Sequence, residues 1–153
     1  MILLKRILLV DDEPAILQTL RMILTTDGYA VETAWSSKEA LDLVKNEPFD
    51  LVVTDFNMPG MKGDELALLI KERWPETPVV MVTGSAEILR STGRALPGVD
   101  VLIGKPFNLA GFRSEIAQLI AEAEIYAKPA REAAWSDTVQ PGINVSHVQL
   151  CDS

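Results

Sequence analysis

The chain has 153 residues, of which 48% are hydrophobic and 24% are charged, a composition typical of a single folded domain rather than a disordered chain. Its net charge of −8 argues against unaided binding to nucleic acids, whose phosphate backbones attract basic surfaces. The same charge disfavours anionic membranes, so we expect neither nucleic acid nor membrane as a direct partner.

The N-terminal segment and the cysteine content bear on the compartment. The segment is apolar, but Lys5 and Arg6 interrupt it and two aspartates follow soon after, which fits neither a signal peptide nor a membrane span. The single cysteine, Cys151, cannot form an internal disulfide, and this fits a reducing compartment. We therefore expect a cytoplasmic protein.

The first part of the chain alternates short apolar runs with amphipathic stretches. Arg6–Val10 is apolar almost throughout, which predicts a buried strand. Pro14 suits the first turn of a helix, and the apolar stripe that follows it at helical spacing stops before Gly28. Ala30–Ala34 has the weaker character of an edge strand. Ser36 lies three residues before a glutamate, which predicts a capping box at the start of a second helix.

The same alternation continues to the end of the predicted domain. Buried strands are predicted at Leu51–Thr54 and Val79–Thr83, with a weaker strand at Val101–Gly104. The predicted helices between and after these strands are Gly63–Arg73, Ala86–Arg94 and Leu109–Ala127.

Strands that alternate with helices over short connections predict an α/β fold, a doubly wound parallel sheet with helices on both faces. We expect this domain to cover residues 1–127. From Lys128 onwards the helical periodicity is lost, so residues 128–153 are interpreted as a C-terminal tail or a truncated linker. This segment is too short to be an output domain of its own.

Polar side chains occur where the predicted strands end. They are Asp11 and Asp12 after the first strand, Asp55 after the third, Thr83 in the fourth and Lys105 after the fifth. In a doubly wound sheet the functional crevice lies at the carboxyl ends of the strands. We therefore expect these side chains to converge there although they are far apart in the sequence.

Three carboxylates in one crevice would repel each other strongly. Two unit charges about 5 Å apart at an effective dielectric of about 20 repel by roughly 3 kcal/mol, so three such pairs cost on the order of 10 kcal/mol before protonation relieves them. A divalent cation and a nearby ammonium would offset this repulsion. Mg²⁺ prefers carboxylates, waters and a substrate phosphate as ligands. A carboxylate such as Asp55 can also attack phosphorus and form an aspartyl phosphate.

Four segments together resemble the response-regulator receiver family of two-component signalling. They are Val10–Pro14, Thr54–Gly63, Val80–Gly84 and Gly104–Phe107, in the order and at the spacing of the family. The resemblance covers about residues 5–127. It implies a chemotaxis-regulator-like, flavodoxin-like (βα)5 fold whose five parallel strands are in the order 2-1-3-4-5.

The resemblance also implies a role for each residue of the acidic crevice. Asp55 resembles the phosphate acceptor. Asp12 resembles the direct Mg²⁺ ligand, and Asp11 the residue that holds metal-bound water. Asn57 occupies the position whose backbone carbonyl binds the metal.

Further implied roles concern the polar and switching residues. Thr83 resembles the hydroxyl that bonds the phosphoryl group, and Lys105 the lysine that pairs with it. Lys105-Pro106 resembles the cis peptide of the family. Leu102 stands where the family usually has a Tyr or Phe that moves with the threonine, and Ser85 stands where the family varies widely. We therefore expect Leu102 to be passive packing, with the signal passing mainly through the Gly84–Ser85 loop and the helix after it.

The implied function is a phosphorylation-dependent switch rather than a conventional enzyme, although such a domain catalyses its own phosphotransfer. A histidine kinase or histidine phosphotransfer protein would donate the phosphoryl group, Mg²⁺ would be required, and a downstream effector protein would respond. A homodimer is compatible with this function. The chain could act alone or be part of a longer regulator or hybrid kinase.

Single motifs are also compatible with simpler roles. Asp11 and Asp12 could be helix-capping acids, Asp55 could begin a plain turn, and Lys105 could be a solvated surface lysine. A phosphohydrolase of the haloacid dehalogenase type needs an aspartate two residues after the nucleophile, where this chain has Asn57. A degenerate scaffold that binds partners without phosphorylation is a third possibility.

Overall fold

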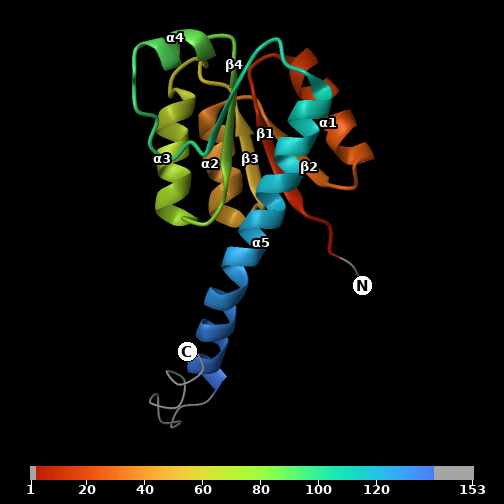
Figure 1. The fold of residues 1–153 in the computed structure, drawn as a ribbon, viewed down its shortest axis with the longest axis vertical. Helices are drawn as coiled ribbons and strands as arrows, with labels where there is room; N and C mark the ends of the chain where they lie inside the picture. Colours follow the sequence, from red (N-terminus) through yellow and green to blue (C-terminus); the bar gives the residue numbers. More distant parts are fainter. Residues whose placement is uncertain (1–2, 140–153) are drawn as a thin grey trace. The chain divides into compact units, whose positions relative to one another are not determined.

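Five parallel strands form one sheet in the order β2-β1-β3-β4-β5 (Figure 1). The strands are β1 (Arg6–Val10), β2 (Ala30–Ala34), β3 (Leu51–Thr54), β4 (Val79–Thr83) and β5 (Val101–Gly104). All five have their predicted bounds, and the predicted doubly wound fold and strand order are confirmed. The structure is a computed structural model that describes residues 3–139, with side chains described for residues 3–125.

Helices cover both faces of the sheet (Figure 1). Successive side chains of a strand point to opposite faces, so Ile7 and Leu9 pack against one group of helices while Leu8 and Val10 pack in a second core on the other face. Burial on both faces explains why the central strands are apolar almost throughout. The first core includes residues of α1 (Pro14–Thr26) and α5 (Leu109–Val139), and the second includes residues of α2 (Ser37–Asn46) and α3 (Gly63–Arg73).

The predicted start of α2 and end of α1 are both confirmed. The Ser36 hydroxyl accepts a hydrogen bond from the amide of Glu39 at 3.1 Å, and the Glu39 carboxylate accepts one from the amide of Trp35 at 3.0 Å. The first bond is the one that the predicted capping box requires, whereas the Glu39 carboxylate bonds the amide one residue before the N-cap instead of the amide of Ser36 itself. Gly28 follows the C-cap of α1 with a φ of 98°, a left-handed conformation that favours glycine.

Two helices end at different places from those predicted. Helix α4 covers Ala86–Ser91 and stops three residues earlier than expected. Gly93 causes this early end, because it follows the C-cap residue with a φ of 63°, the left-handed conformation that closes many helices. Helix α5 instead continues past its predicted end at Ala127 to Val139. The alanine-rich residues 130–134 have high helix propensity, and the proline at 129 does not stop the helix there.

The chain divides into two units, residues 1–123 and 124–153. In the second unit, the backbone is helical up to Val139, so the prediction that helical structure is lost at residue 128 is wrong. The remaining residues of the predicted tail, including Cys151, lie outside the described residues. The separation of a domain at 1–127 from a tail at 128–153 stays a prediction. Among the described helices, none combines the length with the apolar character that a membrane span requires.

Candidate functional site

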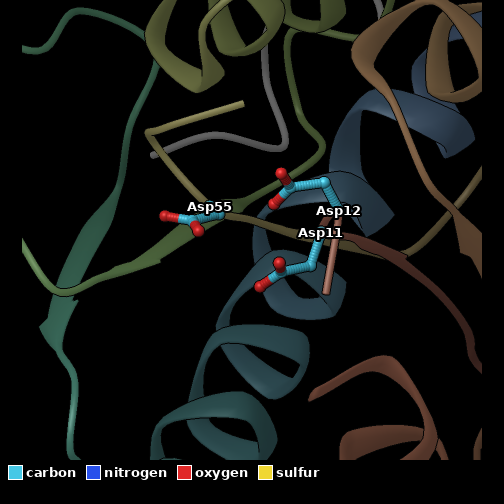
Figure 2. A group of neighbouring side chains, drawn as sticks. All are labelled: Asp11, Asp12 and Asp55. Atoms are coloured by element: carbon cyan, nitrogen blue, oxygen red, sulfur yellow. The ribbon is translucent and has the colours of Figure 1, made fainter. Parts of the chain in front are cut away.

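Three carboxylates meet at the carboxyl ends of β1 and β3 (Figure 2). Asp11 and Asp12 directly follow β1, and Asp55 directly follows β3, the neighbouring strand in the sheet. One ligand oxygen from each of the three side chains lies within 4.8 Å of the others. Asp11 and Asp55 are buried, whereas Asp12 is exposed. The predicted convergence of these aspartates is therefore confirmed.

The backbone of the sheet holds the cluster in place. The amide of Asp55 donates to the carbonyl of Val10 at 3.0 Å, and the amide of Asp11 donates to the carbonyl of Ala34 at 3.2 Å. Both bonds continue the parallel pairing of the strands just past their ends. Two of the aspartates are thus fixed by the same register that aligns β1, β2 and β3.

Lys105 brings a positive charge to the cluster. Its ammonium lies 3.0 Å from Asp11 Oδ2 and 3.3 Å from Asp55 Oδ2. Its amide donates to the carbonyl of Thr83, and the predicted cis peptide between Lys105 and Pro106 is present. Burial lowers the pKa of the Lys105 ammonium, but the hydrogen bonds and charges of the two aspartates outweigh it, so the pKa is raised overall. This lysine is therefore positively charged at neutral pH and is not a solvated surface residue.

Asp11 is buried, so water solvates its carboxylate poorly. Burial raises the pKa of its carboxyl group, and the hydrogen bonds from the Glu13 amide and from Lys105 offset this only in part. Three carboxylates and one ammonium carry a net charge of −2 when all are ionised. A divalent cation would balance that charge, and carboxylate oxygens are the ligands that Mg²⁺ prefers. The residues present thus fit a Mg²⁺ site.

Asp55 makes hydrogen bonds on both carboxylate oxygens. Its Oδ1 accepts from the amide of Phe56 at 2.6 Å and from the amide of Asn57 at 3.4 Å, and its Oδ2 faces Lys105. Both oxygens are therefore held in a fixed orientation at the edge of the sheet. The role of the Asn57 backbone carbonyl as a metal ligand stays a prediction.

The loop after β4 is hydrogen-bonded to the segment that follows Asp55. Thr83 is fully buried, and its Oγ1 accepts a hydrogen bond from the amide of Ser85 at 3.2 Å. The Asn57 amide group donates to the Ser85 hydroxyl at 2.8 Å. The segment after Asp55 and the β4–α4 loop are thus directly connected, a contact that sequence reasoning did not find.

Sequence reasoning also missed the groups that support the segment after β3. Gly63, the first residue of α3, packs so closely on Asp55 that an added Cβ atom would lie 2.0 Å from the Asp55 carbonyl oxygen. The amide of Gly63 donates to the carbonyl of Phe56 at 3.0 Å. The buried hydroxyl of Ser37 donates to the carbonyl of Met61 at 2.9 Å. No periodic pattern reports such contacts; the glycine at the start of a helix was the one available signal.

Leu102 lies on β5 opposite Met81 and is partly buried. Its backbone carbonyl accepts a hydrogen bond from Nη2 of Arg90 in α4 at 2.7 Å. Its position on the last strand is as predicted. Its part in switching stays a prediction.

The comparisons with known proteins decide the family. The family model described as "Response regulator receiver domain" matches residues 7–117, which is more than half of the chain. The chain belongs to the response-regulator receiver family. The strand order 2-1-3-4-5 of this receiver agrees with that membership.

Curated relatives of this receiver are considerably longer proteins. It is 32% identical over 133 residues to the transcriptional regulatory protein GlrR of Escherichia coli (strain K12), covering 87% of this chain and 29% of that protein. It is 32% identical over 115 residues to the response regulator MprA of Mycolicibacterium vanbaalenii, covering 75% of this chain and 50% of that protein. The chain thus spans half or less of the length of these relatives.

Solved structures similar to this receiver match it over most of its length. A CheY-like receiver domain protein from Methanospirillum hungatei JF-1 has a TM-score of 0.76 and 37% identity, covering 81% of this chain and 99% of that one. The response regulator TrrA from Thermotoga maritima, solved in complex with Mg²⁺ and BeF, has a TM-score of 0.70 and 33% identity, covering 76% of this chain and 99% of that one.

Proposed function

We propose that this receiver accepts a phosphoryl group on Asp55 in a Mg²⁺-dependent reaction. The donor is a histidine kinase or a histidine phosphotransfer protein, and an effector protein reads the phosphorylated form. The observation that carries the proposal is the position of Asp55 within the acid cluster of Asp11, Asp12 and Asp55, next to Lys105, whose ammonium lies 3.3 Å from the Asp55 carboxylate. Direct binding to nucleic acid is not part of the proposal, because the net charge is −8.

The reaction is a transfer between two nucleophiles. An oxygen of the Asp55 carboxylate forms a bond to phosphorus, the bond between phosphorus and the donor imidazole nitrogen breaks, and that nitrogen keeps the electron pair. The transferring group carries spread negative charge, so positioning and electrostatic stabilisation dominate catalysis. The Lys105 ammonium and the Thr83 hydroxyl are the protein groups that would stabilise this charge.

The acid cluster and Asn57 would hold the metal. Asp12 and Asp55 are the direct carboxylate ligands of the proposal, Asp11 holds a metal-bound water, and Asn57 contributes its backbone carbonyl. When bound, Mg²⁺ supplies positive charge to the phosphoryl oxygens. TrrA, solved with Mg²⁺ and BeF, supports this assignment by its similarity to the present chain.

Phosphorylation by a small acyl phosphate tests the proposed function. Incubation with acetyl phosphate and Mg²⁺ should add one phosphoryl group that hydroxylamine removes, because an aspartyl phosphate is an acyl phosphate. Excess chelator should prevent the labelling, since three clustered carboxylates without a divalent cation repel the incoming phosphate. Intact-mass spectrometry measures both results. Labelling that survives hydroxylamine, or that is equally fast with chelator, would contradict the proposal.

Replacement of Leu102 tests whether this residue is passive packing. Leu102→Ala should label at a rate within about twofold of the wild type, because the leucine side chain has no charge or hydrogen-bonding group to lose and the backbone carbonyl that binds Arg90 is retained. The free energy of unfolding should fall by about 1 kcal/mol, as expected for a partly buried leucine. Beryllofluoride, which stands in for the phosphoryl group, should still change hydrogen exchange in the Gly84–Ser85 loop. Loss of that change would make Leu102 the switch.

A further inference from the structure

Arg94 connects the α4–β5 loop to the segment that carries Asp55. We define the acceptor segment as residues 55–64. Arg94 Nη2 lies 2.7 Å from Oδ2 of Asp64, the second residue of α3. Its guanidinium carbon lies 5.5 Å from the ring centroid of Phe56, the residue directly after Asp55. One side chain therefore contacts the second and the last residue of the acceptor segment.

The loop that carries Arg94 is itself fixed to α3. Gly98 approaches the helix so closely that an added Cβ atom would lie 3.1 Å from the backbone of Ala67. Asp100, at the end of the loop, forms an ion pair with Lys71 of α3 at 2.8 Å. The early end of α4 at Gly93 starts this loop just before Arg94. Arg94 thus extends from an anchored loop, and its contacts join two defined parts of the fold.

The largely buried carboxylate of Asp64 is stabilised by its ion pair with Arg94. Its carboxylate is only 15% exposed, and its Oδ1 is buried without a hydrogen-bond partner among the described residues. A buried carboxylate oxygen without a partner is costly, because it has lost the water that would solvate it. Arg94 compensates part of this cost through Oδ2. Loss of Arg94 would leave Asp64 free to turn towards water and so disturb the first turn of α3.

A displacement of Phe56 or of Asp64 would also move Asp55. The Phe56 amide donates to Asp55 Oδ1 at 2.6 Å, so a shift of Phe56 turns the carboxylate. Gly63, next to Asp64, packs directly against the Asp55 carbonyl, and its amide donates a hydrogen bond to the Phe56 carbonyl. The contact of Arg94 with Phe56 thus constrains the carboxylate of Asp55, and its contact with Asp64 constrains the backbone of Asp55.

We propose that Arg94 is a positioning residue for Asp55 that couples the conformation of the α4–β5 loop to phosphorylation. This inference rests on the proposed function, because it assumes that Asp55 accepts the phosphoryl group. Positioning of the nucleophile contributes to rate when the reacting groups are held in line. Coupling is reciprocal for binding, so occupation of the phosphoryl site must change the loop if the loop changes the affinity of the site.

The first measurement is the rate of labelling by acetyl phosphate at saturating donor and Mg²⁺. Arg94→Gln should lower the rate constant about fivefold, the size expected when a partly exposed ion pair and a cation–π contact are lost together. The Mg²⁺ concentration for half-maximal rate should stay the same, because Arg94 does not contact the acid cluster. Arg94→Lys keeps the charge but not the planar group and should recover part of the rate.

The matched control is Arg90→Gln. This change removes an arginine with the same charge from the adjacent helix, where it bonds the Leu102 carbonyl and has no described contact with the acceptor segment. Its labelling rate should stay within about twofold of the wild type. Asp64→Asn combined with Arg94→Gln should be no slower than Arg94→Gln alone, because the two side chains act as one pair. Equal thermal midpoints of the single variants would show that folding is unchanged.

The second measurement is hydrogen exchange of residues 92–100 with and without beryllofluoride and Mg²⁺. The wild type should show a change in this loop, and Arg94→Gln should lose it. Wild-type labelling together with an undiminished rate and an undiminished loop response in Arg94→Gln would overturn the inference and leave the proposed function standing. A wild type that never becomes labelled would overturn the proposed function, and the inference with it.

Discussion

Asp55→Asn should abolish labelling by acetyl phosphate. The amide that replaces the carboxylate has no anionic oxygen to attack phosphorus. The fold should survive, because asparagine has the same shape and its oxygen can still accept the hydrogen bond from the Phe56 amide at the position of Asp55 Oδ1. Removal of one of three clustered negative charges also lowers the repulsion within the site. Intact mass after incubation with Mg²⁺ and donor measures the loss.

The control for this variant is Asp42→Asn, which removes the same charge from an exposed position on α2. Its labelling should equal that of the wild type. Fragmentation of the labelled wild type should place the phosphoryl group on Asp55. Undiminished labelling of Asp55→Asn, or a group mapped to Asp11 or Asp12 in the wild type, would mean that the acceptor is wrongly assigned.

The strands and the convergence of the site were predictable because they follow from local composition. A strand buried on both faces must be apolar almost throughout, so Arg6–Val10 and Leu51–Thr54 stand out from the amphipathic helices around them. Once the strands are placed in a parallel sheet, their carboxyl ends lie at one edge. Asp11, Asp55 and Lys105 then meet although they are up to 94 residues apart. No knowledge of side-chain packing is needed for this step.

The helix ends were less predictable because helix-forming residues compete there with nearby glycine and proline residues that favour an end. The apolar pattern after Ala86 is too short to show where α4 stops, and the left-handed conformation of Gly93 decides it. In α5 the proline at 129 suggested an end, yet helix-forming residues on both sides carry the backbone on to Val139. A single proline or glycine can therefore be weighed correctly only with its neighbours.

Apart from the glycine at the start of α3, nothing in the sequence indicated the groups that support the acceptor segment. Arg94 and Asp64 are 30 residues apart and meet because of how the α4–β5 loop packs on α3. The hydrogen bond from Asn57 to Ser85 likewise joins two loops 28 residues apart. Spacing along the chain carries no record of such pairs. The groups that would carry the chemistry follow from strand ends, whereas the groups that hold them in place follow from tertiary packing.

Gly63→Ala should destabilise the fold more than any substitution of Asp55, Arg94 or Leu102 proposed above. The new Cβ atom would lie 2.0 Å from the Asp55 carbonyl oxygen and 2.9 Å from its carbon, distances that real Cβ contacts do not show. Both partners are backbone, so no flexible side chain can move away. The free energy of unfolding should fall by about 2–4 kcal/mol, the upper part of the range for overpacking, despite the better helix propensity of alanine. Urea denaturation at constant m-value measures the loss.

The matched control is Gly111→Ala in the first turn of α5, where an added Cβ atom would meet only the Asn108 Cβ atom at an ordinary 3.9 Å. There the same substitution should stabilise the protein by about 0.5–1 kcal/mol through helix propensity. In the folded fraction of Gly63→Ala, labelling should be at least about tenfold slower, because a displaced Asp55 backbone turns the carboxylate away from Lys105. If Gly63→Ala instead matched Gly111→Ala in stability, the close contact between α3 and Asp55 would not exist in solution. Asp55 would then have no backbone contact with the start of α3, and Phe56 alone would connect Arg94 to Asp55.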